Sequence, residues 1–534
     1  MQIVRIGDGS GKRHAAEVIG AKAAHLSRVA ALGLPVPPAF VLPISLCAAI
    51  VNRESRAQEK LADGLREGIK FLEGASGKRF GDRRRPLLVS VRSGAARSMP
   101  GMLDTVLDVG CTLAAVHGLV RVSGNPRFAW ECRRRFLESY GGVVLGADLA
   151  RLRQLRTQLV AAEGVADERA LDGEALERLA KSYQERLEAD DFSIPDDAME
   201  QLEAAACAVY RSWSSERACT YRRYANLEDL AGTAVMVQAM VYGNRNLASG
   251  AGVAFSRDPS TGVAQPVIDI LFGAQGEDVV SGTSTPESET AIARSLPAVA
   301  SDLREILTRL EREFADVQDV EFTVEDGKLW VLQTRSAKRT PQAALRFAID
   351  FVKEGLMSPT HGLRRLKELD LSKFTRQRLV DVPAPVACGT PASAGIAVGR
   401  AAFDSTSAER MAANDPVILV RPDTSTADVA GFAAAAGIVT AVGGRTAHAA
   451  LVARQMAKPC IVGCRELKVS TNSPSAELGG RAIKQGDWLS IDGETGAIYF
   501  GEFRVAVERP EAELAEIQSW HNQPARRAAL PQPV

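Results

Sequence analysis

The chain has 534 residues, of which 46% are hydrophobic and 24% are charged. This length allows about three or four domains with hydrophobic cores of their own, and it excludes a small disulfide-stapled protein. The 65 Lys and Arg residues balance 65 Asp and Glu residues, so net charge gives no reason to expect a nucleic-acid or membrane partner. The sequence has no apolar run of ~18 residues and no signal-peptide pattern at its start. Eight scattered cysteines without a CxxC pair indicate reduced, mostly buried thiols, and we expect a cytoplasmic protein.

Residues 1–340 form the first predicted domain. A β-rich run at Pro86–Arg92 leads into a loop rich in Gly, Ser and Met, which is typical of a ligand-binding loop. From about 112 to 230 the sequence is heavily charged, with apolar residues at spacings of three and four. This spacing predicts a helical subdomain inserted into the first domain.

The clearest strand signal is a β-hairpin near residue 326. The segments VEFTVE and KLWVLQ flank Asp326-Gly327, a strong two-residue hairpin turn. Their alternation predicts one exposed face that carries Glu321, Thr323 and Glu325.

A boundary follows the hairpin. Thr340 can cap a helix whose first residue is Pro341, which predicts a helical linker over 341–384. A stretch rich in Pro, Ala and Gly then leads into a second domain over 385–505, with a C-terminal tail over 506–534.

His448 stands in a setting that suggests chemistry. A short strand at Ile438–Ala441 runs through Gly443-Gly444 into a helix that begins near Thr446. A strand, a glycine turn and a helix N-terminus together favour a bound anion. Imidazole is nucleophilic near neutral pH, so His448 could accept and hold a phosphoryl group. The alternative from the residues alone is a structural histidine that satisfies a backbone group.

The wider sequence resembles one family. The segment GGRTAHAALVARQMAKPCIVG resembles the phosphohistidine signature of the PEP-utilising enzymes, and GDWLSIDGETGAIYFGE resembles the same domain. The segments GLPVPPAF, SVRSGAARSMPGMLDT, GTAVMVQAMVYGN and DVEFTVEDGKLWVLQTRS are similar to the nucleotide-binding half of the pyruvate phosphate dikinase branch. The resemblance implies a multidomain α+β fold: an ATP-grasp-like nucleotide-binding domain with a helical insertion, then a swivelling β/β/α phosphohistidine domain.

Residue by residue, the resemblance makes His448 the phosphorylated group and Arg135 the residue that binds inorganic phosphate. The implied ATP-binding residues are Lys22, Arg92, Gly101, Thr105, Gln238, Glu277, Asp319, Glu321, Gln333 and Arg335. Glu321 and Gln333 are the implied Mg²⁺ ligands, because opposing hairpin strands let their oxygens converge on one hard cation. The family sequence GGKGAN is replaced by GAKAAH around Lys22, which predicts a stiffer loop and weaker ATP binding.

The family's C-terminal barrel, which binds pyruvate or PEP, has no counterpart in this sequence. The resemblance therefore implies a dikinase-type phosphotransferase that phosphorylates its own His448, converting ATP and phosphate to AMP and pyrophosphate. The phosphoryl group would pass to pyruvate on a separate barrel protein. Two alternatives stay open: a two-domain kinase that phosphorylates another small molecule, and a catalytically silent nucleotide-binding regulator. A homodimer is also left open.

Overall fold

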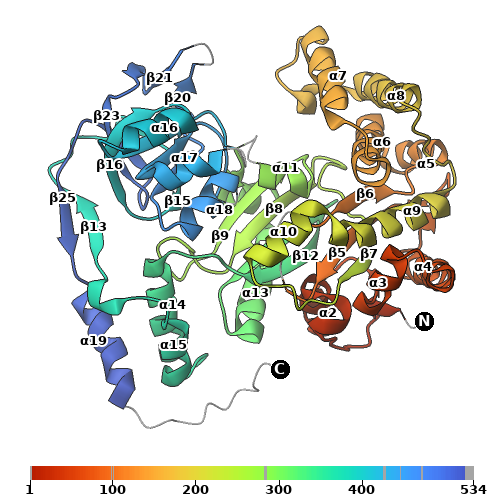
Figure 1. The fold of residues 1–534 in the computed structure, drawn as a ribbon, viewed down its shortest axis with the longest axis horizontal. Coiled ribbons are helices and arrows are strands. Elements are labelled where there is room, and N and C mark those ends of the chain that lie inside the picture. The colour runs from red at the N-terminus through yellow and green to blue at the C-terminus, as the bar shows by residue number, and fades with distance from the viewer. Residues whose placement is uncertain are drawn as a thin grey trace. The chain divides into compact units, whose positions relative to one another are not determined.

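The computed structural model describes residues 3–97, 99, 102–281, 285–424, 428–445, 447–470 and 473–522. Its contacts divide the chain into two compact units, whose elements Figure 1 labels. Unit 1 comprises residues 1–249 and 330–334, and unit 2 comprises residues 250–329 and 335–534. Unit 2 therefore contains both the last part of the predicted nucleotide-binding domain and the predicted phosphohistidine domain.

Unit 1 is built on an antiparallel five-stranded sheet with the order β1-β2-β7-β5-β6. Its strands are β1 (Val4–Ile6), β2 (Ala39–Leu42), β5 (Val89–Ala95), β6 (Thr105–Val109) and β7 (Thr233–Ala239). Every residue of β7 is buried, as expected for an interior strand covered on both faces. Helices α2 (Ala21–Ala31) and α4 (Ser55–Ser76) contact this sheet.

The stretch 112–230, which we predict to be a helical subdomain, is largely helical. Its helices are α5 (Leu113–Ser123), α6 (Pro126–Tyr140), α7 (Leu149–Ala162), α8 (Gly173–Ala189), α9 (Ala198–Arg211) and α10 (Glu216–Tyr224). Each begins after a Thr, Asn, Asp or Ser side chain that accepts a hydrogen bond from a backbone N–H of the first turn. The sequence thus marks the start of each helix locally.

A second five-stranded sheet has the order β10-β9-β8-β11-β12 and belongs to unit 2, except for residues 330–334 of β12, which are part of unit 1. Its strands are β8 (Gly250–Phe255), β9 (Val267–Phe272), β10 (Glu287–Ser288), β11 (Gln318–Glu325) and β12 (Lys328–Ser336). The predicted hairpin is confirmed, and Asp326 and Gly327 have φ angles of 53° and 74°, as its turn type requires. Thr323 is only 2% exposed, so its predicted exposure is wrong. Alternation predicts which residues share a face but not whether that face is covered.

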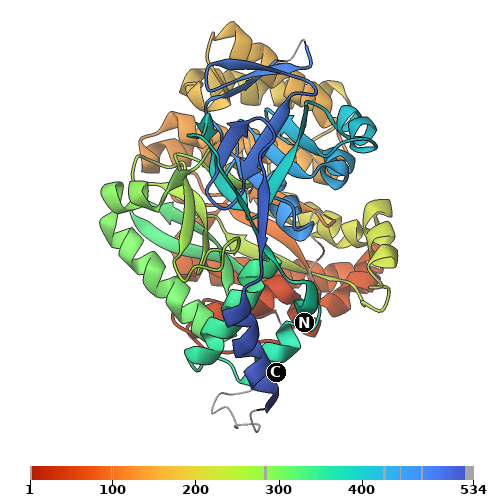
Figure 2. The same ribbon diagram turned by 90° about the vertical axis from the view of Figure 1, so that its left-hand side faces the viewer.

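The predicted linker begins with α14 (Pro341–Lys353), capped by Thr340 as expected, and continues with α15 (Pro359–Arg365). Ala343, Phe347 and Phe351 of α14 are buried in a core shared with β8. The chain then enters β13 (Arg376–Leu379), which pairs antiparallel with β25 (Val505–Glu508). Figure 2 shows this two-stranded ribbon between the 387–500 region and helices α14, α15 and α19 (Glu511–Ser519).

The predicted phosphohistidine domain has an eight-stranded mixed sheet, ordered β14-β24-β23-β16-β17-β18-β19-β15. Strands β16 (Ile396–Ala402), β17 (Val417–Arg421), β18 (Gly437–Thr440) and β19 (Cys460–Val462) are parallel to their neighbours in that run. They are joined by α16 (Ser405–Ala412), α17 (Val429–Ala434) and α18 (His448–Gln455). The remaining strands are β14 (Ala387–Cys388), β15 (Thr390–Ser393), β23 (Trp488–Asp492) and β24 (Ala497–Phe500). A separate small sheet contains β20 (Leu467–Val469), β21 (Ser475–Leu478) and β22 (Arg481–Lys484).

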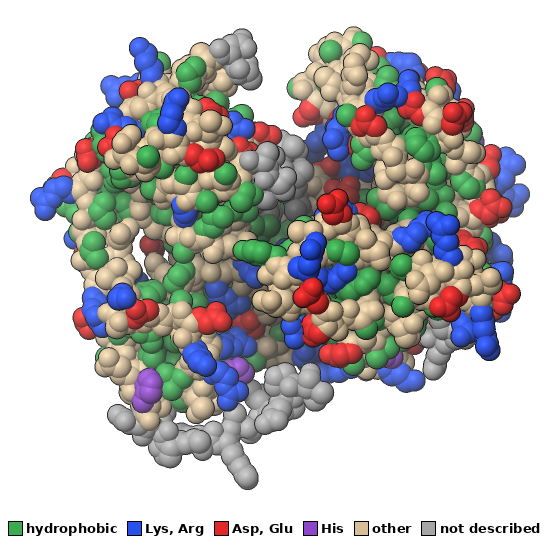
Figure 3. All heavy atoms as spheres, in the orientation of Figure 1, with side chains coloured by type: hydrophobic (Ala, Val, Ile, Leu, Met, Phe, Trp, Pro, Cys, Tyr) green, Lys and Arg blue, Asp and Glu red, His purple; other side chains and the backbone are tan. Residues whose placement is uncertain are grey.

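The surface matches the balanced composition. In the face that Figure 3 displays, acidic and basic side chains are interspersed. None of the helices in the described ranges combines the length and apolar character needed to cross a bilayer. All eight cysteines are free, and five of them are buried.

Candidate functional site

Three predicted ATP-binding residues lie on adjoining elements of unit 1. Lys22 lies in the first turn of α2, and Arg92 on β5 is the register partner of Thr105 on β6. Gly20 has a φ of 80°, and a Cβ there would lie 2.1 Å from the carbonyl oxygen of Gly94 on β5. Only glycine fits at that position. The close approach holds the start of α2, with Lys22, against the strand that carries Arg92.

The charge of Arg92 is available to an anion. Its side chain is half-buried, and no ion pair or side-chain hydrogen bond engages it within the described part of the chain. A partly desolvated guanidinium without a carboxylate partner is well suited to phosphate, which it can bind in a two-pronged geometry.

Gln238 lies on β7, next to β5, but its side chain has a partner in the protein. It is 2% exposed, and its Nε2 donates a hydrogen bond to the carbonyl oxygen of Pro37 at 3.2 Å. Strand β7 therefore lies beside β5, which carries Arg92, and the side-chain amide of Gln238 holds the loop that contains Pro37. Gly101 and Thr446 lie outside the described residues.

A charged cluster forms on β11 and β12 in unit 2. Arg335 Nε donates to Asp319 Oδ2 at 2.8 Å, and Arg335 Nη2 lies 3.9 Å from Glu321 Oε1. Burial raises the pKa of Asp319, and the guanidinium of Arg335 opposes that rise. The other oxygen of Asp319, Oδ1, is buried and accepts no hydrogen bond from the described residues.

The oxygens of this cluster fit a magnesium ion. Mg²⁺ is commonly held by one or two carboxylates together with substrate phosphates and water. Glu321 offers a partly exposed carboxylate within unit 2, whereas the predicted ligand Gln333, on β12, belongs to unit 1. Asp319 adds an unsatisfied oxygen that the sequence prediction of the metal ligands did not include. No group of three or more His, Cys, Asp or Glu side chains forms a metal cage in the described ranges.

Glu277 lies in the first turn of α11 (Gly276–Ser281). Its neighbour Asp278 accepts a hydrogen bond through Oδ2 from the backbone N–H of Gln275 at 2.8 Å, which fixes the start of this helix. The structure therefore places Glu277 at a helix N-terminus, within unit 2.

Arg135 has a structural partner. On α6, its Nε and Nη2 donate to Glu131 Oε1 at 3.1 and 3.0 Å, and both residues are under 10% exposed. Burial opposes the ionisation of Glu131, but Arg135 and Arg127 outweigh burial and lower its pKa to about 2. These contacts explain the presence of Arg135 without a ligand, and they give no support to the predicted phosphate site.

The predicted strand, glycine turn and helix around His448 are confirmed. Strand β18 ends at Thr440, the turn is closed by a hydrogen bond from Ala447 N to Gly444 O at 3.1 Å, and α18 begins at His448. The start of α18 thus follows the carboxyl end of a parallel strand, the usual location of ligand sites in such sheets. The unpaired N–H groups of a helix start favour a phosphoryl group there.

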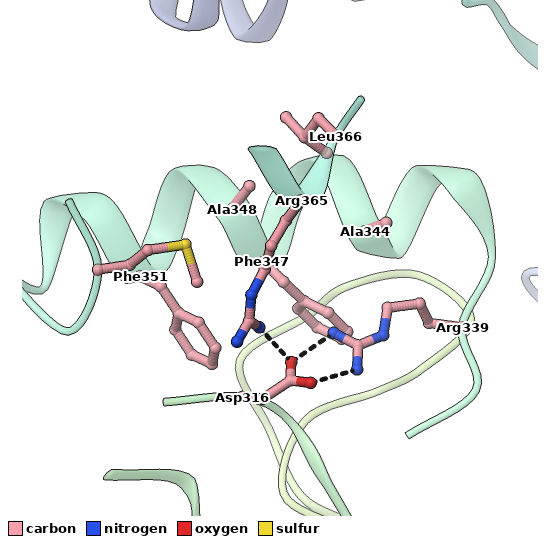
Figure 4. Close-up of a pocket in the computed structure, with 9 residues that line it drawn as sticks. Asp316, Arg339, Ala344, Phe347, Ala348, Phe351, Arg365 and Leu366 are labelled. Atoms are coloured by element: carbon pink, nitrogen blue, oxygen red, sulfur yellow. Dashed lines mark hydrogen bonds and ion pairs between the residues drawn. The ribbon is translucent and has the colours of Figure 1, made fainter. Parts of the chain in front are cut away.

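A small cavity of about 190 Å³ near the predicted linker is drawn in Figure 4. Asp316 accepts from Arg339 Nη1 and Nη2 at 2.7 and 3.1 Å, and Arg365 Nη1 lies 2.7 Å from Asp316 Oδ1. Burial alone would raise the pKa of Asp316, but the two arginines hold it below its usual value. Because Asp316, Arg339 and Arg365 form ion pairs with one another, we interpret this group as a structural contact that holds α14 and α15, and not as an anion site. We call these three residues the clamp.

Comparison with known proteins gives two family matches. The pyruvate phosphate dikinase AMP/ATP-binding domain matches residues 53–301 and 296–355, and the PEP-utilising enzyme mobile domain matches residues 413–496. The pyruvate, phosphate dikinase of Clostridium symbiosum is 39% identical over 516 residues, which cover 94% of this chain and 58% of that protein. The chloroplastic protein of Flaveria trinervia is 40% identical over 527 residues, covering 98% of this chain and 55% of that protein.

A third relative, the pyruvate, phosphate dikinase of Rhizobium meliloti (strain 1021), is 38% identical over 531 residues, covering 96% of this chain and 59% of its own length. The chain thus spans a little over half the length of the relatives it matches. The family match covers more than half of the chain, and these identities extend over nearly all of it. The chain therefore belongs to the pyruvate phosphate dikinase family.

Proposed function

We propose that this chain is the nucleotide-binding and phosphohistidine part of a dikinase-type phosphotransferase that phosphorylates His448 from ATP. The observation that carries the proposal is the start of α18 at His448, directly after a glycine turn at the end of parallel strand β18. Two observations support it, one in each unit. Arg92, which makes no ion pair with the described residues, supplies a cation for phosphate in unit 1. The cluster of Arg335, Asp319 and Glu321 supplies a cation and carboxylate oxygens in unit 2.

The proposed half-reaction balances as follows. A ring nitrogen of His448 attacks the β-phosphorus of ATP, the bond to the oxygen that bridges the α- and β-phosphates breaks, and AMP leaves. Inorganic phosphate then attacks the γ-phosphorus, the bond to the β,γ-bridging oxygen breaks, and pyrophosphate leaves. One phosphoryl group, the former β-phosphate of ATP, remains on His448.

The side chains have separate roles in this proposal. Lys22, Arg92 and Arg335 would offset the charge that spreads over the phosphate oxygens in the transition state. In unit 2, Glu321 and the oxygen of Asp319 that accepts no hydrogen bond from the described residues would hold Mg²⁺, which neutralises phosphate charge when bound. The nucleotide-binding domain would be ATP-grasp-like, and pyruvate on a separate barrel protein would be the final acceptor.

The proposed swivel of the phosphohistidine domain has a structural basis in unit 2. Helix α14 and helix α19 share a core that includes Leu345, Ile349, Ile517 and Trp520. Between these anchored helices, residues 387–500 are connected through β13 and β25, which pair only with each other. We place the pivot at this ribbon, because a two-stranded connection without further sheet neighbours resists bending least.

The test measures the transfer of labelled phosphate from ATP to His448. The protein is incubated with Mg²⁺ and ATP labelled separately at the β- and γ-phosphates, with and without inorganic phosphate. We expect phosphate-stimulated, acid-labile β-label on the wild type and on His117→Ala, which alters an exposed histidine, with release of AMP and pyrophosphate. His448→Ala should take up no label.

Other outcomes would favour the alternatives. Label from the γ-phosphate with release of ADP would indicate a simple kinase. The absence of label under every condition would contradict the phosphohistidine mechanism and favour a silent nucleotide-binding regulator.

A further inference from the structure

The ring of His25 joins helix α2 to a segment of strand β12. Its Nδ1 lies 3.0 Å from the carbonyl oxygen of Thr334. Residues 330–334 of β12 belong to unit 1, as α2 does. A second hydrogen bond, from Val331 N to the carbonyl oxygen of Pro35 at 2.8 Å, holds the same segment on the loop that follows α2. The segment is therefore attached to the α2 region at two residues.

The contact fixes the position of the proton on the ring. A carbonyl oxygen only accepts hydrogen bonds, so Nδ1 of His25 carries a proton and donates it. Burial lowers the pKa of His25, the bond to Thr334 opposes this, and Arg28 lowers the pKa further. Near neutral pH the ring is therefore neutral, with its proton on Nδ1. Thr334 is 1% exposed, so water does not readily replace this donor.

Lys22 lies between two attachments of α2. Gly20 holds the start of the helix against β5, and His25 bonds to β12. Lys22 and His25 are spaced i,i+3, so they share one face of the helix. Gln333 directly precedes the residue that His25 contacts, and no hydrogen bond or ion pair engages its side chain within the described part of the chain. The contact thus brings the strand that carries Gln333 to the helix face that carries Lys22.

We propose that His25 is a positioning residue of the nucleotide site, whose Nδ1–H holds β12 on α2 so that Lys22 and Gln333 act on the same triphosphate. The inference rests on the proposed function, because these two side chains contact ATP only if the chain binds it. Without the donor, β12 keeps the bond from Val331 but loses the one beside Gln333. A displacement of about 1 Å is enough to weaken the contribution of such a group strongly.

The test compares two variants of equal shape in the full chain. His25→Asn keeps an N–H near the position of Nδ1, and asparagine is also the residue at this position in the family sequence GGKGAN. His25→Leu has the size of asparagine without its donor. His117→Leu, at an exposed histidine of α5, is the control. Urea unfolding shows whether each variant is folded, and His25→Gln, whose amide lies farther from the backbone, takes the place of His25→Leu if that variant is not.

The first measurement is amide hydrogen exchange of the ATP-free protein, in peptides that cover residues 330–336. We expect about tenfold faster exchange in His25→Leu, because the strand loses one of its attachments. His25→Asn and His117→Leu should match the wild type. Wild-type exchange in His25→Leu would overturn the holding of β12.

The second measurement is ATP affinity by calorimetric titration, in a double-mutant cycle with Gln333→Ala. We expect His25→Leu to weaken ATP binding about five- to tenfold and His25→Asn to restore it. Gln333→Ala should weaken binding several-fold in the wild type and add little in His25→Leu, because Gln333 is already displaced there. Effects that multiply would show a merely structural His25 and would overturn the positioning role.

Two further outcomes separate this inference from the proposed function. Equal ATP affinity in the wild type and in folded His25→Leu would overturn the positioning role and leave the proposed function intact. If the wild type binds no ATP, the proposed function fails, and the role of His25 in the nucleotide site fails with it. The exchange measurement still decides on its own whether His25 holds β12.

Discussion

Arg335 is anchored to Asp319 at one nitrogen and remains accessible at the others. Its Nε donates to Asp319 Oδ2 at 2.8 Å, and its side chain is 41% exposed, whereas that of Asp319 is 1% exposed. One guanidinium can therefore satisfy a buried carboxylate and still offer N–H groups to a phosphate. The same residue serves the stability of the hairpin and the proposed chemistry.

Replacement of Arg335 by Ala should affect both properties. Asp319 would be left buried without its partner, so we expect a loss of about 1–3 kcal/mol in the free energy of unfolding, measured in urea. The β-label on His448 should also fall. Arg294→Ala, at an exposed arginine on α12 (Glu289–Ser295), is the control and should change the free energy by less than about 0.5 kcal/mol. Equal stability of the two variants would contradict the buried ion pair.

Gly20 should tolerate no side chain. Gly20→Ala places a Cβ 2.1 Å from Gly94 O on a backbone with a φ of 80°, so we expect a loss of more than about 2 kcal/mol of stability. ATP affinity, measured by calorimetric titration, should also decrease, because α2 and Lys22 would shift away from β5. Gly74→Ala, in α4 with no atom within 4 Å of the added Cβ, should instead stabilise by about 0.5–1 kcal/mol. Unchanged ATP affinity in Gly20→Ala would contradict a role of Lys22 in ATP binding.

Much of the fold could be predicted because its signals are local. The hairpin turn at Asp326-Gly327 and the cap at Thr340 depend on residues within a few positions of one another. The glycine turn before His448 is likewise determined by adjacent residues. The structure contains the hairpin turn, the helix cap and the glycine turn.

The remaining features depend on contacts between residues far apart in the chain. His25 and Thr334 are separated by 309 positions, and no spacing rule connects them. Arg135 differs: its match to a family position suggests a phosphate site, which stays a prediction, while Glu131, four residues earlier on the same helix, accepts hydrogen bonds from two of its nitrogens. An i,i+4 acid on a charged helix is a signal that could have indicated this ion pair. The oxygen that Asp319 leaves unsatisfied depends on burial, which the sequence does not give.

The clamp around Asp316 should make stability depend on pH. Its pKa is below the usual value in the folded protein, so the stabilisation is fully present above the unfolded pKa of about 4 and is lost as the pH falls through the lower folded value. At pH 7, Asp316→Asn should cost about 2 kcal/mol, because Arg339 and Arg365 lose their counter-ion. The difference between wild type and variant should shrink below about pH 4. Urea unfolding at a series of pH values checks this, and a constant difference would contradict it.

Variants of Arg135 can distinguish a structural role of this residue from a role in phosphate binding. Arg135→Gln removes the main cation that keeps Glu131 ionised, and both side chains are under 10% exposed, so we expect a loss of about 3–5 kcal/mol of stability. Arg135→Lys keeps the charge and should recover part of that loss. If the ion pair is the whole role of Arg135, the phosphate concentration that gives half-maximal β-label should equal the wild-type value in both variants. A several-fold rise in that concentration, with stability preserved in Arg135→Lys, would instead restore Arg135 to the phosphate site.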